Sequence, residues 1–419
     1  MTKLNFKQKF VTSVATVAIL ANGLAPLAFA GTTIEISGNG AGSDNWSTVN
    51  QTSNTTVTQN NTANVTNNVG ADADTGDNDA NFNTGGGVVI STGNATADID
   101  VANALNSNSA DVSCCAAGDT DVKISGNGAD SNNGVTLTTV NANTVNQGNN
   151  AKVNNDIDSD VDTGDNEALS NTGGDVIIVT GNAKANVSVS TTANVNSAQI
   201  GGGLGAGNPS ASFVISGNGA GADSYITATL AKYNTINQRN YADVKNDVDA
   251  DADTGDNDAN FNTGGDVVID TGNATVDVDV DNSVNFNHAD VDCGCVWDVL
   301  AKIAGNGADT YSGDKEDNII GLTLASVKTI GQGNNALLDN DLEYLDADTG
   351  DNEVNKNTGT PESDPAVVTG NATSNVDVNN SGNVNSVGSL LPFDWPDFPS
   401  ELEFSFSFAA MMAFFGMSF

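Results

Sequence analysis

Small apolar residues alternate with acidic or polar residues over long stretches of the chain. From Ala242 to Asp253 every second residue is Ala, Val or Asn, and the residues between them are Asp or Lys. The same alternation returns from Ala274 to Asp281. A period of two puts one set of side chains on each face of an extended strand, so these stretches predict β-strands with one small, mostly apolar face and one acidic face.

Glycine-containing corners separate the alternating stretches. Thr-Gly pairs begin at Thr254, Thr263 and Thr271, and similarly spaced pairs recur elsewhere in the chain. Gly beside Asn or Asp suits tight β-turns that need positive φ. No segment of this region has a helical period with caps. We therefore predict an all-β chain.

One unit recurs four times along the chain. The segment Ile-Ser-Gly-Asn-Gly-Ala, or a close variant of it, is centred on glycines spaced 88, 91 and 88 residues apart: Gly38, Gly126, Gly217 and Gly305. Two further markers follow in the same order each time, a Gln four residues before an Ala and the sequence Asp-Thr-Gly-Asp-Asn-acid. Such recurrence is the signature of a repeat architecture. It divides the chain into four β-repeats, residues 31–118, 119–208, 209–298 and 299–387.

Two architectures fit these repeats. Short strands joined by Gly and Asn corners around a thin core predict a β-solenoid-like rod. Tandem Ig-like β-sandwiches are the alternative. Residues 31–387 contain only four Phe, which disfavours a sandwich core. Inward-facing Asn at equivalent places predicts an Asn ladder inside a solenoid, formed by Asn67, Asn155, Asn246 and Asn340.

The two terminal segments differ from the repeats. Residues 1–30 combine a basic start, an apolar stretch and the small-x-small pattern Ala28-Phe29-Ala30, which predicts a cleaved signal peptide and an extracellular or cell-surface location. Residues 388–419 hold eight of the fifteen Phe. We expect this apolar segment to attach the protein to the cell envelope, to assemble with a neighbouring subunit, or to cap the open end of the solenoid.

The charge narrows the choice of partners. The chain has 53 acidic residues against 13 Lys and Arg, a formal charge of −40. A protein that binds nucleic acid or an anionic membrane surface requires clustered Lys and Arg, so both kinds of partner are disfavoured. Cations are the partners that such a surface attracts.

Four equivalent Gly-containing turns carry the candidate metal ligands. If the turn brings these carboxylates together, calcium fits, because it takes six to eight oxygen ligands and turn carbonyls can complete the shell. The alternative is a solvated acidic face that keeps the protein soluble. Neither the EF-hand nor the RTX pattern is matched. The predicted ligands are Asp72, Asp74, Asp77, Asp79, Asp160, Asp162, Asp165, Glu167, Asp251, Asp253, Asp256, Asp258, Asp346, Asp348, Asp351 and Glu353.

The four cysteines form two equivalent groups, Cys114-Cys115 and Cys293-Gly294-Cys295, with first members 179 residues apart. Adjacent cysteines rarely bond to each other, since their Cα atoms lie about 3.8 Å apart. In a straight rod, cysteines two repeats apart also cannot meet. We therefore weigh disulfides between chains against a local strained bridge or free thiols. A zinc site is disfavoured by the spacing.

The segments of pattern Gln-x-Asn-x-Ala, first seen at Gln59 to Ala63, resemble the strand–turn signature of curlin amyloid subunits. The chain as a whole resembles secreted bacterial Asn/Gly/Asp-rich β-repeat surface proteins. The curlin resemblance covers a few residues in each repeat, and curlin repeats are much shorter. It implies a surface fibre that assembles from copies of itself.

An enzyme is not expected, because active sites are unique constellations and the acidic groups here are repeated. His288 is the only His, and it belongs to no repeated site. The sequence predicts an exported cell-surface or extracellular-matrix structural protein that self-associates into polymers and binds calcium, as a fibre, adhesin or surface-layer component. The alternative is a secreted carbohydrate-binding or carbohydrate-cleaving β-repeat protein.

Overall fold

The computed structural model describes residues 31–113, 119–201, 210–292, 298–308, 318–359 and 364–388. The predicted signal peptide (residues 1–30), all four cysteines and the apolar C-terminal segment beyond Gly388 lie outside these residues. The described residues form strands and turns, which confirms the all-β prediction. No helix among them is long and apolar enough to cross a membrane.

Each repeat forms one long coil of a β-solenoid. Coil 1 consists of β1 (Thr32–Ser37), β2 (Asp44–Asp74), β3 (Val88–Ser91) and β4 (Ala95–Ser113), and coil 2 of β5 (Thr120–Ser125), β6 (Asn132–Asp162), β7 (Val176–Val179) and β8 (Ala183–Gly201). Coil 3 consists of β9 (Ser210–Ser216), β10 (Asp223–Asp253), β11 (Val267–Asp270) and β12 (Ala274–Asp292). Coil 4 consists of β13 (Asp298–Ala304), β14 (Asn318–Asp341), β15 (Leu345–Asp348), β16 (Ala366–Val368) and β17 (Ala372–Val387).

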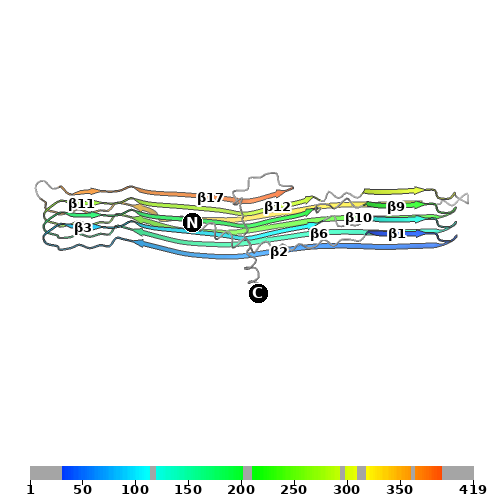
Figure 1. The fold of residues 1–419 in the computed structure, drawn as a ribbon, viewed down its shortest axis with the longest axis horizontal. Helices are drawn as coiled ribbons and strands as arrows, with labels where there is room; N and C mark the ends of the chain where they lie inside the picture. The colour runs from blue at the N-terminus through cyan, green and yellow to red at the C-terminus, as the bar shows by residue number, and fades with distance from the viewer. Residues whose placement is uncertain are drawn as a thin grey trace, which may run out of the picture.

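Equivalent strands of successive coils pair in parallel. The four sheets have the strand orders β1-β5-β9-β13, β14-β10-β6-β2 with β15 beside β10, β16-β11-β7-β3, and β17-β12-β8-β4. The register keeps equivalent residues side by side, so that Gln59 pairs with Gln147, and Gln147 with Gln238. Figure 1 shows the coils lying one above another. The solenoid prediction is confirmed, and the alternative of tandem sandwiches is wrong, because each repeat pairs with the next along its whole length.

The strands are much longer than the short strands that the corners predicted. β2, β6 and β10 each run for 31 residues without a break. At about 3.3 Å per residue such a strand is about 100 Å long, whereas four coils about 4.8 Å apart make a stack only about 15 Å high between strand centres. The long axis of the molecule therefore follows the strands (Figure 1).

This geometry changes the distance used in the disulfide argument. Equivalent positions two repeats apart in the described strands are separated by two coil spacings, about 10 Å, rather than by the length of a module. That separation still exceeds the Cα–Cα distance of about 4.4–6.8 Å in a disulfide, and the cysteines lie outside the described residues, so the disulfide alternatives stay predictions.

The core is thin and is made of small side chains. Its largest cluster consists of Ala, Val and Ile from the long strands and from the strands β4, β8 and β12 that face them. Rows of amides interrupt it. Asn67 donates to Asn155 (2.7 Å), Asn155 to Asn246 (2.6 Å) and Asn246 to Asn340 (2.6 Å), from Nδ2 to Oδ1 each time. The predicted Asn ladder is confirmed, and its inner members satisfy their buried amides through the equivalent residues of neighbouring coils.

Candidate functional site

The predicted metal ligands lie in four acidic columns that run through all four coils. Each column contains one acid from every repeat, held side by side by the parallel register or by backbone hydrogen bonds. Neighbours in a column are separated by the coil spacing of about 4.8 Å. The columns are Asp72/Asp160/Asp251/Asp346, Asp74/Asp162/Asp253/Asp348, Asp77/Asp165/Asp256/Asp351 and Asp79/Glu167/Asp258/Glu353.

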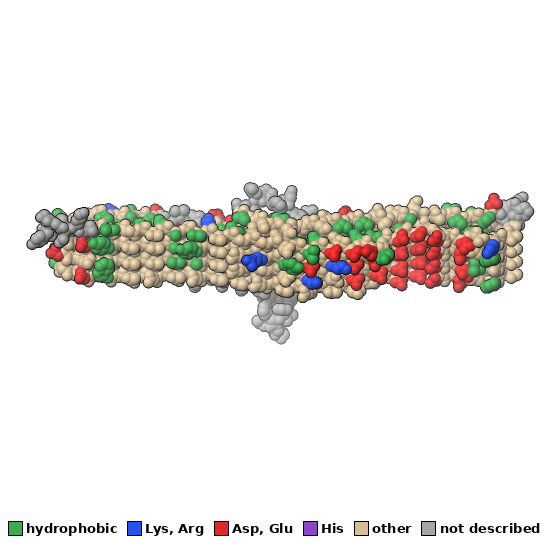
Figure 2. Space-filling model, turned by 180° about the vertical axis from the view of Figure 1, so that it is seen from behind, with side chains coloured by type: hydrophobic (Ala, Val, Ile, Leu, Met, Phe, Trp, Pro, Cys, Tyr) green, Lys and Arg blue, Asp and Glu red, His purple; other side chains and the backbone are tan. Residues whose placement is uncertain are grey.

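The first two columns belong to the outer face of the sheet formed by β2, β6 and β10. In β2 the side chains of Asp72 and Asp74 are more exposed than those of Ala71 and Ala73, as the alternation requires. Figure 2 shows acidic side chains gathered in columns toward one end of the long face. Further acids on alternate positions of the same strands extend this surface, and the metal prediction omitted them: Asp156, Asp158, Asp247 and Asp249. Their identical spacing along the strand is the signal that could have found them.

The turn after each long strand is fixed by its own polar groups. Asp74 Oδ1 accepts a hydrogen bond from the Gly76 N–H (2.6 Å), and Asn78 Nδ2 donates to the carbonyl oxygens of Thr75 (3.0 Å) and Gly76 (2.8 Å). The other three turns repeat this pattern. The turn carbonyls expected to complete a calcium shell thus already accept hydrogen bonds from an Asn side chain.

Backbone geometry explains the residue types at this turn. Asp77 has φ of 55°, and its equivalents in the other coils are also left-handed, a conformation that Asp tolerates better than most residues. A Cβ at Gly164 would collide with the carbonyl oxygen of Gly255 in the next coil. Glycine is therefore required by the close stacking of one turn on another.

The arrangement differs from the point-like cluster expected from the sequence. Acids of different repeats stand above one another along the stack. Among the described residues, no group of three or more His, Cys, Asp or Glu side chains has the geometry of a metal site. Calcium binding therefore stays a prediction, and the relevant surface is an extended array of carboxylates.

Burial between like charges changes the acidity of the inner coils. Burial, opposed by a hydrogen bond from the Gly255 N–H and reinforced by neighbouring acids, raises the pKa of Asp253 to about 7. The same causes, with Gly164 as the donor, raise the pKa of Asp162 to about 6. Burial and the charges of adjacent acids also raise the pKa of other column members, namely Asp160, Asp165, Asp251, Asp256 and Asp258. Such carboxyls favour a bound proton or a nearby cation.

Lysines do not neutralise the acidic columns. The four ion pairs formed among the described residues leave out every column member. Lys245 Nζ, for example, lies 2.9 Å from Asp247 Oδ2, which is four residues before the nearest column acid on that strand. Coulomb repulsion within the columns is therefore not offset by basic side chains of the described chain.

A second group of acids lies on the sheet formed by β4, β8, β12 and β17. Five Asp line a shallow depression there: Asp98, Asp100, Asp277, Asp279 and Asp377. Asp277 is hydrogen-bonded by Asn375 Nδ2 (2.7 Å) and paired with Lys184 Nζ (3.1 Å), and these two donors hold the pKa of Asp277 below its ordinary value. Since side-chain donors already stabilise Asp277 here, the acidic columns are the stronger cation candidate.

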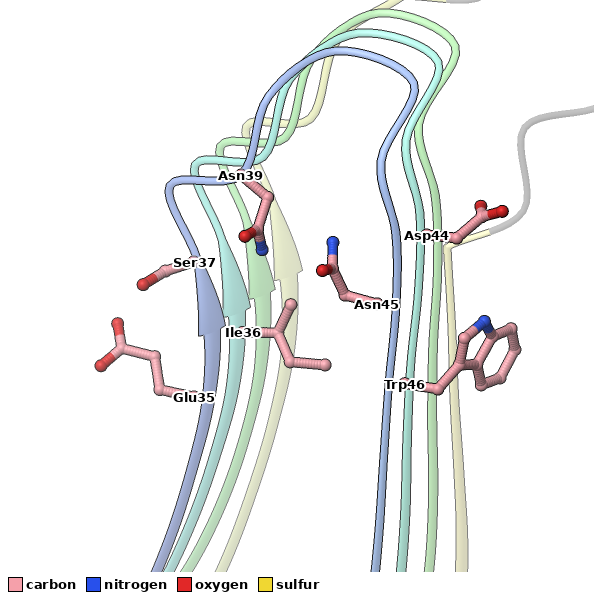
Figure 3. A pocket seen from close by; sticks show the side chains of 7 residues that line it. All are labelled: Glu35, Ile36, Ser37, Asn39, Asp44, Asn45 and Trp46. Atoms are coloured by element: carbon pink, nitrogen blue, oxygen red, sulfur yellow. The ribbon is translucent and has the colours of Figure 1, made fainter.

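A second depression lies at the outer edge of coil 1, between β1 and β2. Figure 3 shows Ile36, Asn39 and Asn45 pointing into the space between the two strands, whereas Glu35, Ser37, Asp44 and Trp46 point away from it. The inward side chains are the end members of columns that continue through coil 2. The depression is therefore the open cross-section of the solenoid.

No family model, curated protein or solved structure matches this chain.

Proposed function

We propose that this protein is an exported structural protein of the cell surface or extracellular matrix, which self-associates and binds calcium along its acidic columns. The roles that fit are a fibre, an adhesin or a surface-layer component. Export rests on residues 1–30, which have the features of a cleaved signal peptide.

The observation that carries this proposal is the in-register stacking of four similar coils. The acidic columns on the outer face and the Gln ladder beneath the surface are both repeated at the coil spacing. An enzyme concentrates its chemistry in one place, whereas a scaffold presents the same groups at regular intervals. The repeated surface therefore favours a structural role.

Calcium is supported by the electrostatics of the columns. Carboxylates about 4.8 Å apart in the stack, without lysines between them, repel one another. Divalent cations between neighbouring acids offset that repulsion, and calcium accepts carboxylate ligands in variable number and geometry. Burial and neighbouring acids raise the pKa values of Asp162 and Asp253, and such carboxyls favour a bound proton or a nearby cation.

Calcium titration by calorimetry, followed by thermal unfolding with calcium and with a chelator, tests this function. We expect saturable binding and a higher Tm with calcium than with magnesium or chelator. The variant Asp162→Asn/Asp253→Asn removes two inner carboxylates and should weaken binding, whereas Asp98→Asn on the opposite sheet should not. Absence of binding, or equal loss in both variants, contradicts a calcium role for the columns.

The scaffold role has its own test. Electron microscopy of the protein on the producing cells should show it in surface-attached assemblies. If the purified chain instead binds one glycan saturably, or cleaves it, the carbohydrate alternative replaces the structural one.

A further inference from the structure

The stack of coils ends in two different open edges. β2 and β4 form one edge in coil 1, and β14 and β17 form the other in coil 4. Among the described residues neither edge has a partner on its outer side. An unpaired strand offers a row of backbone N–H and C=O groups that can pair with another chain.

Coil 4 exposes the interior of the solenoid. Ile303 and Val376 point inward, yet Ile303 is 46% exposed and Val376 is 48% exposed. Their equivalents in coil 3, Ile215 and Val278, are 0% and 3% exposed because coil 4 covers them. An additional layer on coil 4 would bury its apolar residues in the same way.

Coil 1 has residues of the right type to form that layer. At the positions equivalent to Ile303 and Val376 it carries Ile36 and Ile99. The polar positions match as well, since each of the following coil 4 residues has the same residue type in coil 1: Gln332 and Gln59, Asn334 and Asn61, Asn340 and Asn67, Asn380 and Asn103. Coil 1 of a second copy therefore has the composition of a fifth coil.

The amide ladders give the edges a direction. Asn61 Nδ2 donates to Asn149 Oδ1 (3.1 Å), Asn149 to Asn240 (3.2 Å) and Asn240 to Asn334 (3.0 Å), always from the lower-numbered coil to the higher. The Gln ladder runs the opposite way, with Gln147 Nε2 donating to Gln59 Oε1 (2.8 Å). When coil 1 of one copy stacks on coil 4 of another with parallel strands, both ladders place an amide donor opposite an amide acceptor. No other pairing of the two edges does so with the strands still parallel. Two identical edges facing each other would make the strands antiparallel and lose this register.

We propose that coil 1 of one copy stacks in parallel register on coil 4 of another, and that repetition of this contact builds a polar fibre whose axis is perpendicular to the long strands. This inference rests on the self-association in the proposed function and specifies its partner and surface. The contact is heterologous, so it does not close on itself and continues as a filament.

The two edges match best over most of the long strand. Residues 45–68 of β2 are equivalent to residues 318–341 of β14 through the coils between them. Beyond Asp341, one extra residue separates β14 from β15, and Tyr344 is left-handed (φ 51°) and 78% exposed. A bulge of this kind interrupts an edge strand. The proposed pairing therefore centres on β14.

Blocking one edge at a time tests the proposal. The Thr75 N–H donates to the Asp162 carbonyl oxygen, and the Ser43 carbonyl oxygen accepts from the Asn132 N–H. Backbone groups alternate sides along a strand, so those of odd-numbered residues of β2 point toward coil 2. The N–H groups of even-numbered residues of β2 therefore point outward. Thr56→Pro/Thr66→Pro therefore removes two outward donors from coil 1. By the same alternation, Ser326→Pro/Ala336→Pro removes two from coil 4, since the Ala250 N–H of coil 3 faces coil 4. Alanine at 56, 66 and 326 provides the controls.

The full chain and the alanine controls should form filaments, seen by light scattering and electron microscopy with calcium near pH 5. Each proline variant alone should stay monomeric, with a circular dichroism spectrum like that of the parent. Their equimolar mixture should give a single species of twice the monomer mass by light scattering, because each supplies the edge that the other lacks.

The other results distinguish the alternatives. Dimers of either proline variant alone mean that identical edges associate, which overturns the proposed polarity but leaves self-association intact. A monomeric full chain that polymerises after deletion of residues 389–419 means that the apolar C-terminal segment covers coil 4, and the proposal is wrong. A chain that stays monomeric with and without that segment contradicts the proposed function itself.

Discussion

The raised pKa of Asp253 predicts that one substitution stabilises the protein at high pH. In the folded state this carboxyl has a pKa of about 7, compared with an ordinary value of 3.8. The folded state therefore binds the proton more tightly than the unfolded state does. Stability falls as pH rises from about 4 to about 7, because the unfolded state then holds fewer protons than the folded one. Above this window the ionised Asp253 destabilises the fold.

The size of the effect follows from the pKa difference and from exposure. At about 1.4 kcal/mol per pH unit, the difference corresponds to at most about 4 kcal/mol. The side chain is only half-buried, so solvent screening reduces the expected gain to about 1–2 kcal/mol. Asp253→Asn removes the charge and keeps an oxygen that can accept the Gly255 N–H. We expect this variant to be more stable than the parent by that amount near pH 8 and equal to it near pH 4.

Urea unfolding followed by circular dichroism across this pH range, without divalent cations, measures the difference. Asp277→Asn is the matched control, since donors from Asn375 and Lys184 lower the pKa of Asp277 and its substitution should destabilise the protein at high pH. Calcium should reduce the advantage of Asp253→Asn by stabilising the parent. A variant that is less stable than the parent near pH 8, or a difference independent of pH, would refute this electrostatic reasoning.

Two further substitutions test the packing of the coils. Asn155→Ala should cost about 3 kcal/mol in urea unfolding, because Asn67, Asn103 and Asn246 lose a buried partner; a loss no larger than that of Asn68→Ala, at an exposed position, would show that the ladder contributes little. Gly164→Ala should cost about 1–3 kcal/mol because its Cβ meets backbone in coil 3, whereas Gly333→Ala, which meets no atom within 4 Å, should be near neutral. Equal Tm values for Gly164→Ala and Gly333→Ala would contradict the close stacking of the turns.

The sequence alone determined the local structure and the repeat. Alternation from Ala242 to Asp253 specified a strand and its two faces, since side chains of an extended chain alternate whatever surrounds them. Equal residue types at equal spacing also predicted the ladder through Asn155, because parallel in-register stacking is the arrangement that lets identical amides pair. The acidic character of the outer face came from the same alternation.

Only the tertiary structure decided how far the strands run and which groups become neighbours. A Gly-Asn corner fits a turn in any coil, but the sequence does not tell whether a strand ends at 10 residues or at 31. The acids around Gly76 were expected to gather at their own turn, and stacking instead placed each beside its equivalents in other repeats. Two phenylalanines illustrate the same limit, since Phe213 is 0% exposed and Phe82 is 77% exposed. Such neighbours are fixed by contacts between repeats about 90 residues apart in the chain, which local patterns cannot encode.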